Sequence, residues 1–320
     1  MHYSIRHVSL FRYSHPVRES VMELRMQPRS EANQSLRRFQ IATNPRVQPF
    51  AYTDHFGNAV YHFNLLRDHS ELRVEAQSVV EVQEPMVLPK EADVLEWDRY
   101  NKLNLRSEHY EFLEPSAFAT MTPTLAAFMS AHELERPRID PLSALKRLND
   151  TMFTAFEYEV GITEVNSPID HALASRRGVC QDFAHIMIAI ARDWGIPAGY
   201  VSGYLSHTRQ NRERSSEDAT HAWVEAYLPS FGWISFDPTN NIMGTSRHIR
   251  AAVGRDYSDV PPTRGTFKGG ADSELAVAVS VAPTSAPIRH EDFLRLVRPM
   301  GQTTSGRSPD RNVQQQQQQQ

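Results

Sequence analysis

Apolar and polar residues alternate along the first 84 residues in short runs that are typical of β-strands. The runs are rich in β-branched and aromatic residues, and turn signals such as Asn44-Pro45 and Gly57-Asn58 separate them. They span residues 3–13, 21–26, 36–42, 60–66 and 72–82. Strands that follow one another without helices between them predict a β-sandwich-like domain over residues 1–84.

A helical period replaces this alternation after a connecting segment. Residues 85–122 contain prolines and charges with little periodicity, which indicates a linker. One helix is predicted near Pro123, and a second at Asp140-Pro141, where a capping residue precedes proline. A third, short helix is expected to start at Ser167-Pro168.

The clearest apolar stripe of the chain follows Cys180. Its members recur at spacings of four, three and four residues, the spacing of side chains on one face of a helix. They are Phe183, Met187, Ile190 and Trp194. Gly195 and Pro197 supply the stop signals. The pattern therefore predicts a helix that holds Cys180 at its start.

Strand patterns return after this helix. Residues 200–205 and 221–228 are predicted strands, and 233–237 is the expected hairpin partner of 221–228. Residues 206–218 are polar throughout, which indicates an exposed loop. A last run at 275–281 is predicted to complete a sheet, so that residues 123–282 form one domain of helices and antiparallel strands. The chain is therefore expected to be α+β.

The residues beyond Ala282 have a different composition. Pro, Ser, Thr, Arg and Gln dominate, and the chain ends in a run of glutamines from Gln314 to Gln320. Such a segment offers too little apolar surface to form a packed core. We therefore expect a disordered tail over residues 283–320.

Composition and charge narrow the classes of protein. The 320 residues include 40% hydrophobic and 22% charged residues, enough for a sizeable core. A net charge of −4 argues against a dedicated nucleic-acid partner. No apolar run is as long as a membrane span, and the N-terminus lacks a signal-peptide pattern, so we predict a cytoplasmic protein without a membrane partner.

Cys180 is the only cysteine of the chain, so an intrachain disulfide and a cysteine-rich metal site are both excluded. Unpaired backbone N–H groups at the start of the predicted helix, with Arg176 and Arg177 just upstream, favour an anionic, nucleophilic thiol. The alternative is that Cys180 is a small buried hydrophobic residue, as most free cysteines are. The stretch alone leaves both interpretations open.

Two residues of the predicted hairpin supply the partners that a nucleophilic thiol needs. His221 lies at the start of one strand, and Asp237 lies at the end of the next. A cysteine, a histidine and an aspartate scattered along the chain can form a nucleophile, a base and a group that orients the base. We therefore take Cys180, His221 and Asp237 as the candidate catalytic residues.

Strand geometry tests this assignment. Opposed residues of an antiparallel pair have a constant sum of residue numbers and share a face. A four-residue loop at residues 229–232 gives a sum of 461 and places His221 and Asp237 on opposite faces. A sum of 460 opposes His221 to Thr239 and makes Asp237 its diagonal neighbour. We therefore predict an odd-length loop or a bulge, with Gly232 adopting the unusual backbone.

These segments also resemble a known family. The motifs are Arg-x-Gly-Val-Cys-Gln-Asp-Phe-Ala-His around Cys180, Gly195-Ile-Pro197, Tyr200-Val-Ser-Gly-Tyr204, His221-Ala-Trp-Val-Glu and Gly232-Trp-Ile-x-Phe-Asp-Pro-Thr-Asn. They are similar to the bacterial transglutaminase-like superfamily, which belongs with the papain-like thiol enzymes. The resemblance covers roughly residues 150–282, and residues 1–84, with Asp54-His-Phe-Gly-Asn58, resemble the β domain that precedes the catalytic domain in such proteins.

The resemblance implies that Cys180 is the nucleophile, His221 the base and Asp237 the orienting group. It implies a thiol-dependent acyl-transfer enzyme that acts on peptide or side-chain amides through a thioester, and we expect a cysteine peptidase or amidase with a peptide or protein substrate. The alternatives are a protein-glutamine amine transglutaminase and a catalytically silent interaction module. We expect no cofactor and no metal: no EF-hand loop appears that would suggest calcium, and zinc needs more than one thiolate, two histidines and a carboxylate of unknown geometry.

Other candidates have simpler explanations. His185 should lie away from the thiol's face of the helix, as a core histidine, and Asp182 suits the first helical turn. Tyr158 or Trp233 could supply an oxyanion donor, and Glu225 and Trp223 could line a cleft beside His221. The triplet His55, His62 and His69 has a spacing of seven, which puts neighbours on opposite strand faces, so a shared metal is not expected.

Overall fold

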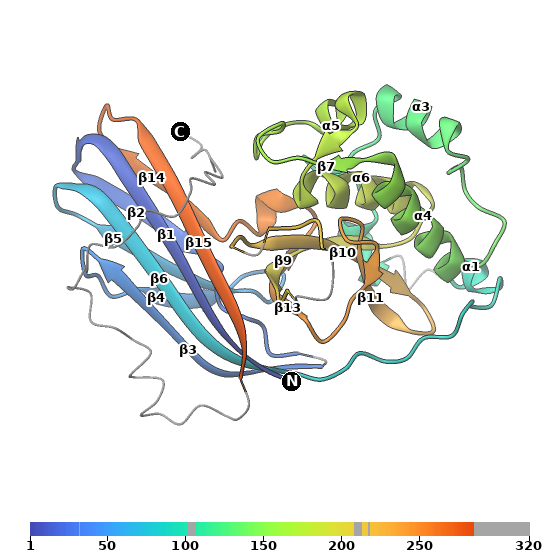
Figure 1. Cartoon of the computed structure of the whole chain (residues 1–320), viewed down its shortest axis with the longest axis horizontal. Coiled ribbons are helices and arrows are strands. Elements are labelled where there is room, and N and C mark those ends of the chain that lie inside the picture. Colours follow the sequence, from blue (N-terminus) through green and yellow to red (C-terminus); the bar gives the residue numbers. More distant parts are fainter. Residues whose placement is uncertain (32, 101–106, 208–212, 217, 285–320) are drawn as a thin grey trace.

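The computed structural model describes residues 1–31, 33–100, 107–207, 213–216 and 218–284. Figure 1 shows two parts side by side: a β-sandwich, and a domain in which helices cover a sheet. This is the α+β architecture expected from the sequence. The predicted disordered tail lies outside the described residues, except that 283 and 284 end the last strand. No helix in the described part of the chain is long and apolar enough to cross a membrane.

The sandwich consists of two antiparallel four-stranded sheets. The first has the order β15-β1-β6-β3, and its strands are β1 (His2–Val17), β3 (Gln34–Asn44), β6 (His69–Val82) and β15 (Ser273–Thr284). The second has the order β14-β2-β5-β4, and its strands are β2 (Glu19–Leu24), β4 (Phe50–Thr53), β5 (Ala59–Leu65) and β14 (Thr263–Lys268).

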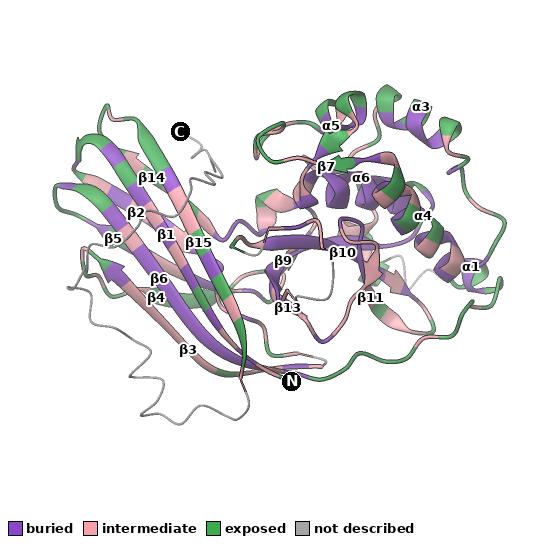
Figure 2. Cartoon of the chain, in the orientation of Figure 1, coloured by how far each residue is buried: buried purple, intermediate pink, exposed green. Residues whose placement is uncertain are grey.

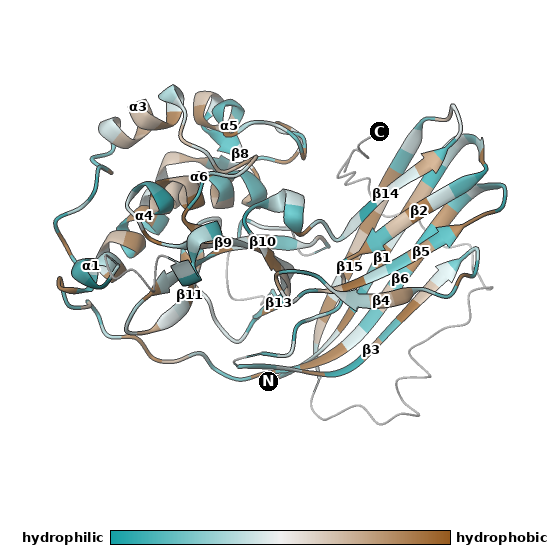
Figure 3. Cartoon of the chain, turned by 180° about the vertical axis from the view of Figure 1, so that it is seen from behind, coloured by the Kyte–Doolittle hydropathy of each residue, from teal (hydrophilic) through white to brown (hydrophobic). Residues whose placement is uncertain are grey.

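Alternation along the strands builds the core of the sandwich. In β2, every second residue is buried, and Met22 and Leu24 face the apolar side chains of the opposite sheet, such as Phe11 and Val74. Figure 3 shows the corresponding alternation of hydrophobic and hydrophilic residues along these strands. The pattern did not predict β4, because all four of its residues are exposed and carry no signal of alternating burial.

The last two strands correct the predicted domain boundary. The run at 275–281 was expected to complete a sheet of the domain 123–282, but it lies in β15, which pairs with β1 from His2↔Thr284 to Tyr13↔Ser273. β14 pairs in turn with β2. Residues 263–284 therefore belong to the sandwich. A period of two identifies a strand but does not say which sheet it joins, because partner choice depends on contacts distant in sequence.

The second domain begins with helices. Its helical elements are α1 (Glu96–Arg99), η1 (Tyr110–Phe112), α3 (Pro123–Ala131), α4 (Pro141–Ala155), α5 (Ile169–Ser175), α6 (Cys180–Asp193) and η2 (Tyr257–Asp259). Two short parallel strands, β7 (Glu157–Tyr158) and β8 (Arg177–Gly178), hold the segment that leads into α6. Asp140 caps α4 by accepting a hydrogen bond from the Ser143 N–H (3.0 Å), as its position before proline predicted.

A five-stranded antiparallel sheet carries the rest of the domain. Its order is β12-β11-β10-β9-β13, and its strands are β9 (Ala198–Leu205), β10 (His221–Leu228), β11 (Gly232–Asp237), β12 (Ile242–Met243) and β13 (His248–Gly254). Helix α6 packs on this sheet, and Phe183, Ile186 and Ile190 share a core with Val224 and Ala226 of β10. Figure 2 shows that α6, β9 and β10 are the most buried elements of this domain.

Side chains of the sandwich cover the free edge of β13. The Gln34 amide donates to the Arg250 carbonyl and accepts from the Arg250 N–H, both at 2.9 Å. The Asn58 amide makes the same pair of bonds to Val253, both at 2.8 Å. Each carboxamide thus replaces one residue of a neighbouring strand. An apolar cluster that includes Tyr3 and Ile249 packs beside them, so the two domains are joined by specific contacts.

We expect Gln34→Ala and Asn58→Ala each to lower the free energy of unfolding by about 1–3 kcal/mol, because the first leaves the Arg250 N–H and the second the Val253 N–H without the side-chain acceptor that it has in the wild type. Urea unfolding followed by fluorescence measures the change. Asn64→Ala is the matched control, since Asn64 is exposed on β5 and its loss should change stability by less than about 0.5 kcal/mol. Equal stability of all three variants would contradict the proposed edge contacts.

Candidate active site

Cys180 is the first residue of α6, as predicted. Two bonds hold the entrance to this helix: the Asp182 carboxylate accepts from the Val179 N–H (2.8 Å) and from the Thr163 hydroxyl (2.6 Å). Burial raises the pKa of Asp182. A side chain at Gly178 would place its Cβ 2.6 Å from the Asp182 carboxylate, so glycine is needed there. Asp182 is therefore a capping residue, in agreement with the sequence analysis.

The hairpin of β10 and β11 has the predicted register. Leu228 pairs with Gly232 and Val224 pairs with Phe236, which gives a sum of 460 and a three-residue loop. Gly232 adopts a φ of +76°, a conformation that favours glycine. His221 and Asp237 consequently share a face, and His221 Nε2 lies 2.9 Å from Asp237 Oδ2.

Asp237 is fully buried and is held as a carboxylate by donors on both oxygens. Oδ1 accepts from the backbone N–H groups of Thr239 (3.1 Å) and Asn240 (3.2 Å). Oδ2 lies near His221, the Asn240 side-chain amide (2.8 Å) and His248 Nε2 (3.2 Å). Burial alone would raise the pKa of Asp237, but His221 and His248 outweigh it and hold the pKa well below its usual range.

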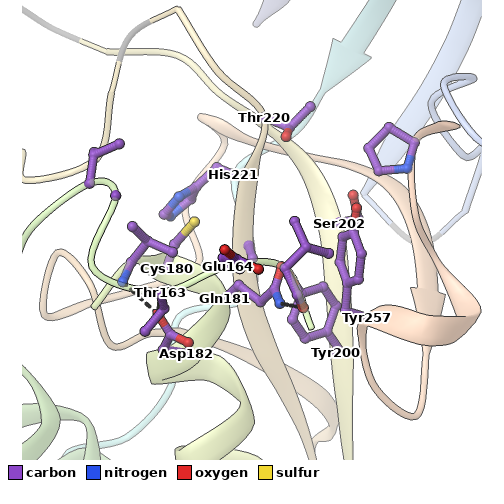
Figure 4. Close-up of a pocket in the computed structure, with 16 residues that line it drawn as sticks. Thr163, Glu164, Cys180, Gln181, Asp182, Tyr200, Ser202, Thr220, His221 and Tyr257 are labelled. Atoms are coloured by element: carbon purple, nitrogen blue, oxygen red, sulfur yellow. Dashed lines mark hydrogen bonds between the residues drawn. The ribbon is translucent and has the colours of Figure 1, made fainter. Parts of the chain in front are cut away.

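His221 is positioned to act on the thiol. Its Nδ1 is buried and has no hydrogen-bond partner among the described residues, and Figure 4 shows the Cys180 sulfur directed toward its ring. Burial would lower the pKa of His221, but the Asp237 carboxylate, with a contribution from Cys180, raises it to about 10. The structure thus brings Cys180, His221 and Asp237 together, with the imidazole between sulfur and carboxylate.

A pocket of about 190 Å³ opens at the thiol. It is lined by the loop 160–165, the start of α6, strands β9 and β10, and Tyr257 and Pro262 (Figure 4). Hydroxyl groups of Tyr200, Ser202 and Thr220 are among its polar groups. A substrate carbonyl placed in this pocket can reach both the sulfur and the first backbone N–H groups of α6, which have no partners inside the helix.

Of the other candidate residues, one lies near the thiol and the rest lie outside the pocket. Tyr158 pairs with Gly178 across β7 and β8, two residues before Cys180, and burial and then the charge of Cys180 raise its pKa. Trp233 does not line the pocket; it is exposed on β11, beside Tyr227 (5.5 Å between ring centroids). Glu225 and Trp223 do not line the pocket either, since the Glu225 carboxylate accepts from Ser235 and Trp223 is fully buried.

His185, His55 and His69 each have a bonding partner away from the thiol, as expected from the sequence. His185 is buried, accepts a hydrogen bond from the Tyr257 N–H (3.1 Å), and burial lowers its pKa to about 3. His55 is exposed and pairs with Glu111, while His69 is buried and bonded to Ser20 (2.9 Å). The triplet of histidines therefore does not converge on one point.

The sequence analysis missed His248, the first residue of β13. One ring nitrogen of His248, one of His221 and a carboxylate oxygen of Asp237 all lie within 4.8 Å of one another, a spacing at which such groups can hold a metal ion. The Thr245 N–H, however, points at His248 Nδ1 (3.2 Å) and places the proton of a neutral ring on Nε2. A metal at Nε2 would require this proton to move to Nδ1, where the Thr245 N–H already occupies the lone pair, so these residues do not fit a metal site.

The raised pKa of His221 makes stability depend on pH. A group with a raised pKa stabilises the fold fully below its unfolded value of 6.5, and this contribution is lost as the pH rises toward about 10. We therefore expect the unfolding free energy of the wild type to fall more steeply over this window than that of His221→Gln, by up to about 1.4 kcal/mol per pH unit. Urea unfolding at several pH values tests this, and equal slopes would contradict it.

The fold and the site define a class of protein: a thiol at the start of a buried helix, with an imidazole and a carboxylate on adjacent antiparallel strands, is the arrangement of papain-like thiol enzymes. Residues 129–238 match the model of the transglutaminase-like superfamily, and residues 3–81 match that of the bacterial transglutaminase-like N-terminal region. The chain belongs to the transglutaminase-like superfamily, whose members are typically cysteine-dependent enzymes.

Three known proteins are similar to this chain. A protein of Mycobacterium leprae is 33% identical over 281 residues, which cover 86% of this chain and 96% of the relative. A protein-glutamine gamma-glutamyltransferase of Pseudomonas aeruginosa is 31% identical over 119 residues, 35% of this chain and 18% of that protein. A crystal structure of a candidate cysteine protease from Cytophaga hutchinsonii shares the fold, with a TM-score of 0.68, 19% identity, and coverage of 90% of this chain and 92% of that one.

Proposed function

We propose that the protein is a thiol-dependent acyl-transfer enzyme in which Cys180 is the nucleophile, His221 the acid and base, and Asp237 the orienting group. The observation that carries this proposal is the position of His221, bonded to Asp237 through Nε2 and facing the thiol through Nδ1 at the edge of a pocket. Membership of the transglutaminase-like superfamily supports it.

The chemistry follows from the positions of these groups. The Cys180 thiolate forms a bond to the carbonyl carbon of an amide, and the carbonyl electrons move onto oxygen, where the N–H of Cys180 can stabilise them. The C–N bond then breaks, and the amine leaves with the proton of the His221 imidazolium. The resulting thioester is resolved by water or an amine, which gives a proton back to His221 as the sulfur departs.

We propose hydrolysis as the main reaction, and therefore a cysteine peptidase or amidase. This preference comes from the sequence, which contains no EF-hand loop of the kind that would suggest calcium-dependent cross-linking. The second candidate is amine transfer, and the similarity to the gamma-glutamyltransferase of Pseudomonas aeruginosa favours it. Both reactions share the acylation step, so the same three residues serve either.

A panel of glutaminyl and other peptides, incubated with and without a primary amine, distinguishes the two reactions. Hydrolysis predicts that product forms at the same rate without the amine and is absent in Cys180→Ala. Amine incorporation that outruns hydrolysis would replace our preference by the transglutaminase function. Absence of both reactions, together with an unreactive thiol, would leave the interaction module as the better account.

Two further expectations stay predictions from the sequence. These are a peptide or protein substrate and a cytoplasmic location without nucleic-acid or membrane partners. The silent interaction module is the weaker function, because such proteins usually lack one of the catalytic residues. This chain retains all three candidates: Cys180 and His221 line one pocket, and Asp237 is bonded to His221 at 2.9 Å behind it.

A further inference from the structure

We propose that His248 is a positioning residue of this active site: a neutral hydrogen-bond donor that holds the Asp237 carboxylate where it can pair with His221. The proposal rests on the proposed function, since it concerns the same three residues. Two imidazoles approach one oxygen, Asp237 Oδ2, with His221 Nε2 at 2.9 Å and His248 Nε2 at 3.2 Å. Both rings are buried.

The second ring nitrogen determines how each histidine behaves. His248 Nδ1 has two neighbours on Thr245: the hydroxyl at 3.3 Å, which can donate or accept, and the backbone N–H at 3.2 Å, which can only donate. His248 Nδ1 must therefore keep its lone pair, so the proton of the ring lies on Nε2 and points at Asp237. His221 Nδ1 faces the thiol instead and has no such donor, so this ring is free to carry a second proton.

The charges around the two rings support this division. Burial is the largest influence on His248 and lowers its pKa, and the cations of His221 and Arg247 oppose its protonation further. Asp237 on β11 acts in the opposite direction. His221 belongs to β10, Asp237 to β11, and Arg247 to the segment just before β13. His221 thus pairs with Asp237 as a cation, and His248 donates to the same oxygen as a neutral ring.

The place of His248 depends on the fold of the whole chain. His248 begins β13, whose free edge is covered by the Gln34 and Asn58 side chains of the sandwich. The ring also packs edge-on against Trp223, with 5.2 Å between ring centroids. His248 does not line the pocket. Its loss should therefore alter the rate of the chemical step and leave substrate binding unchanged.

Two substitutions test the role of His248. His248→Phe keeps a ring but removes the donor, whereas His248→Gln retains an amide N–H that can donate to Asp237. We expect kcat to fall roughly 10- to 100-fold in His248→Phe with KM unchanged, the size of loss seen when a group that orients a functional histidine is removed. The alkaline limb of the pH profile should move to lower pH in His248→Phe, and His248→Gln should recover most of the rate.

His7→Phe is the matched control for losing a buried, neutral histidine, because His7 is 1% exposed and lies in the sandwich. Thermal unfolding shows whether each variant is folded. An unchanged kcat and pH profile in folded His248→Phe, or an equal loss in His248→Phe and His248→Gln without a shift of the profile, would overturn the proposal. A wild type without thiol-dependent turnover would instead refute the proposed function.

Nitrogen-15 NMR of the wild type tests the protonation of the two rings directly, without any substitution. Labelled histidine nitrogens report which ring atom carries a proton. We expect His248 at pH 7 to be neutral with its proton on Nε2, and His221 to carry protons on both nitrogens. A proton on His248 Nδ1, or a charged His248 beside a neutral His221, would overturn the proposal.

Discussion

Cys180→Ala is expected to lose essentially all turnover, by about 10⁴-fold or more, while it keeps the fold. The reaction needs a sulfur nucleophile, and the chain contains no second thiol that could replace it. Alanine fits the site, because Cys180 is 8% exposed and packs within the core around α6. Peptide turnover measures the loss, and thermal unfolding shows that the variant is folded.

Alkylation of the wild type provides the control for this substitution. Iodoacetamide should modify Cys180 and stop turnover to the same extent as Cys180→Ala does. The sequence is unchanged in this sample, so the loss reports the thiol itself. Residual turnover above about a hundredth of the wild-type rate in either sample would mean that the thiol is not the nucleophile.

Asp237→Asn should reduce turnover by about 10⁴-fold, the second largest effect that we expect. The amide has the shape of the carboxylate but no charge, so it cannot maintain the raised pKa of His221. Its NH₂ group would also face nitrogens that donate to Asp237 in the wild type, which disfavours the present orientation of the imidazole. Iodoacetamide modification of Cys180 at pH 7 should slow as well, because the thiolate loses a charged imidazolium partner.

Asp256→Asn is the matched control for Asp237→Asn. Asp256 is also fully buried and accepts hydrogen bonds from backbone N–H groups, those of Phe118 and Ser258, but it does not line the pocket. We expect this variant to lose stability and to retain turnover when folded. Equal turnover in the two variants would show that Asp237 acts only through stability.

Local patterns in the sequence predicted the parts of the site that depend on neighbouring residues. The apolar stripe after Cys180 predicted where α6 begins, and counting residues across the hairpin predicted the shared face of His221 and Asp237. Both features depend on periods and turn lengths of a few residues. The resemblance to the transglutaminase-like superfamily then related these positions to a reaction.

Features that depend on distant residues were not predictable in this way. His248 stands alone at the start of a strand, and only the order of β11, β10, β9 and β13 in the sheet brings it to Asp237. The assignment of β15 to the sandwich is of the same kind, because its partner β1 lies at the opposite end of the sequence. Neither relation leaves a mark on the local pattern of apolar residues.

Because β14 and β15 at the end of the chain pair with β2 and β1 at its start, the role of the sandwich cannot be studied by simple truncation. Deleting residues 1–84 removes β1 and β2, the partners of β15 and β14, and removes the side chains that cover β13. Loss of turnover in such a truncated chain would therefore report misfolding. Point substitutions at Gln34 and Asn58 in the full chain avoid this problem.

Trapping the acyl-enzyme tests the central claim most directly. The protein is mixed with p-nitrophenyl acetate, quenched in acid, and analysed by intact mass and peptide mapping. Our account predicts one acetyl group on Cys180 that neutral hydroxylamine removes, as it does from a thioester, and none on His221→Ala at the same time of reaction. An acetyl group that never appears on Cys180, or that forms there equally fast without His221, would contradict the account.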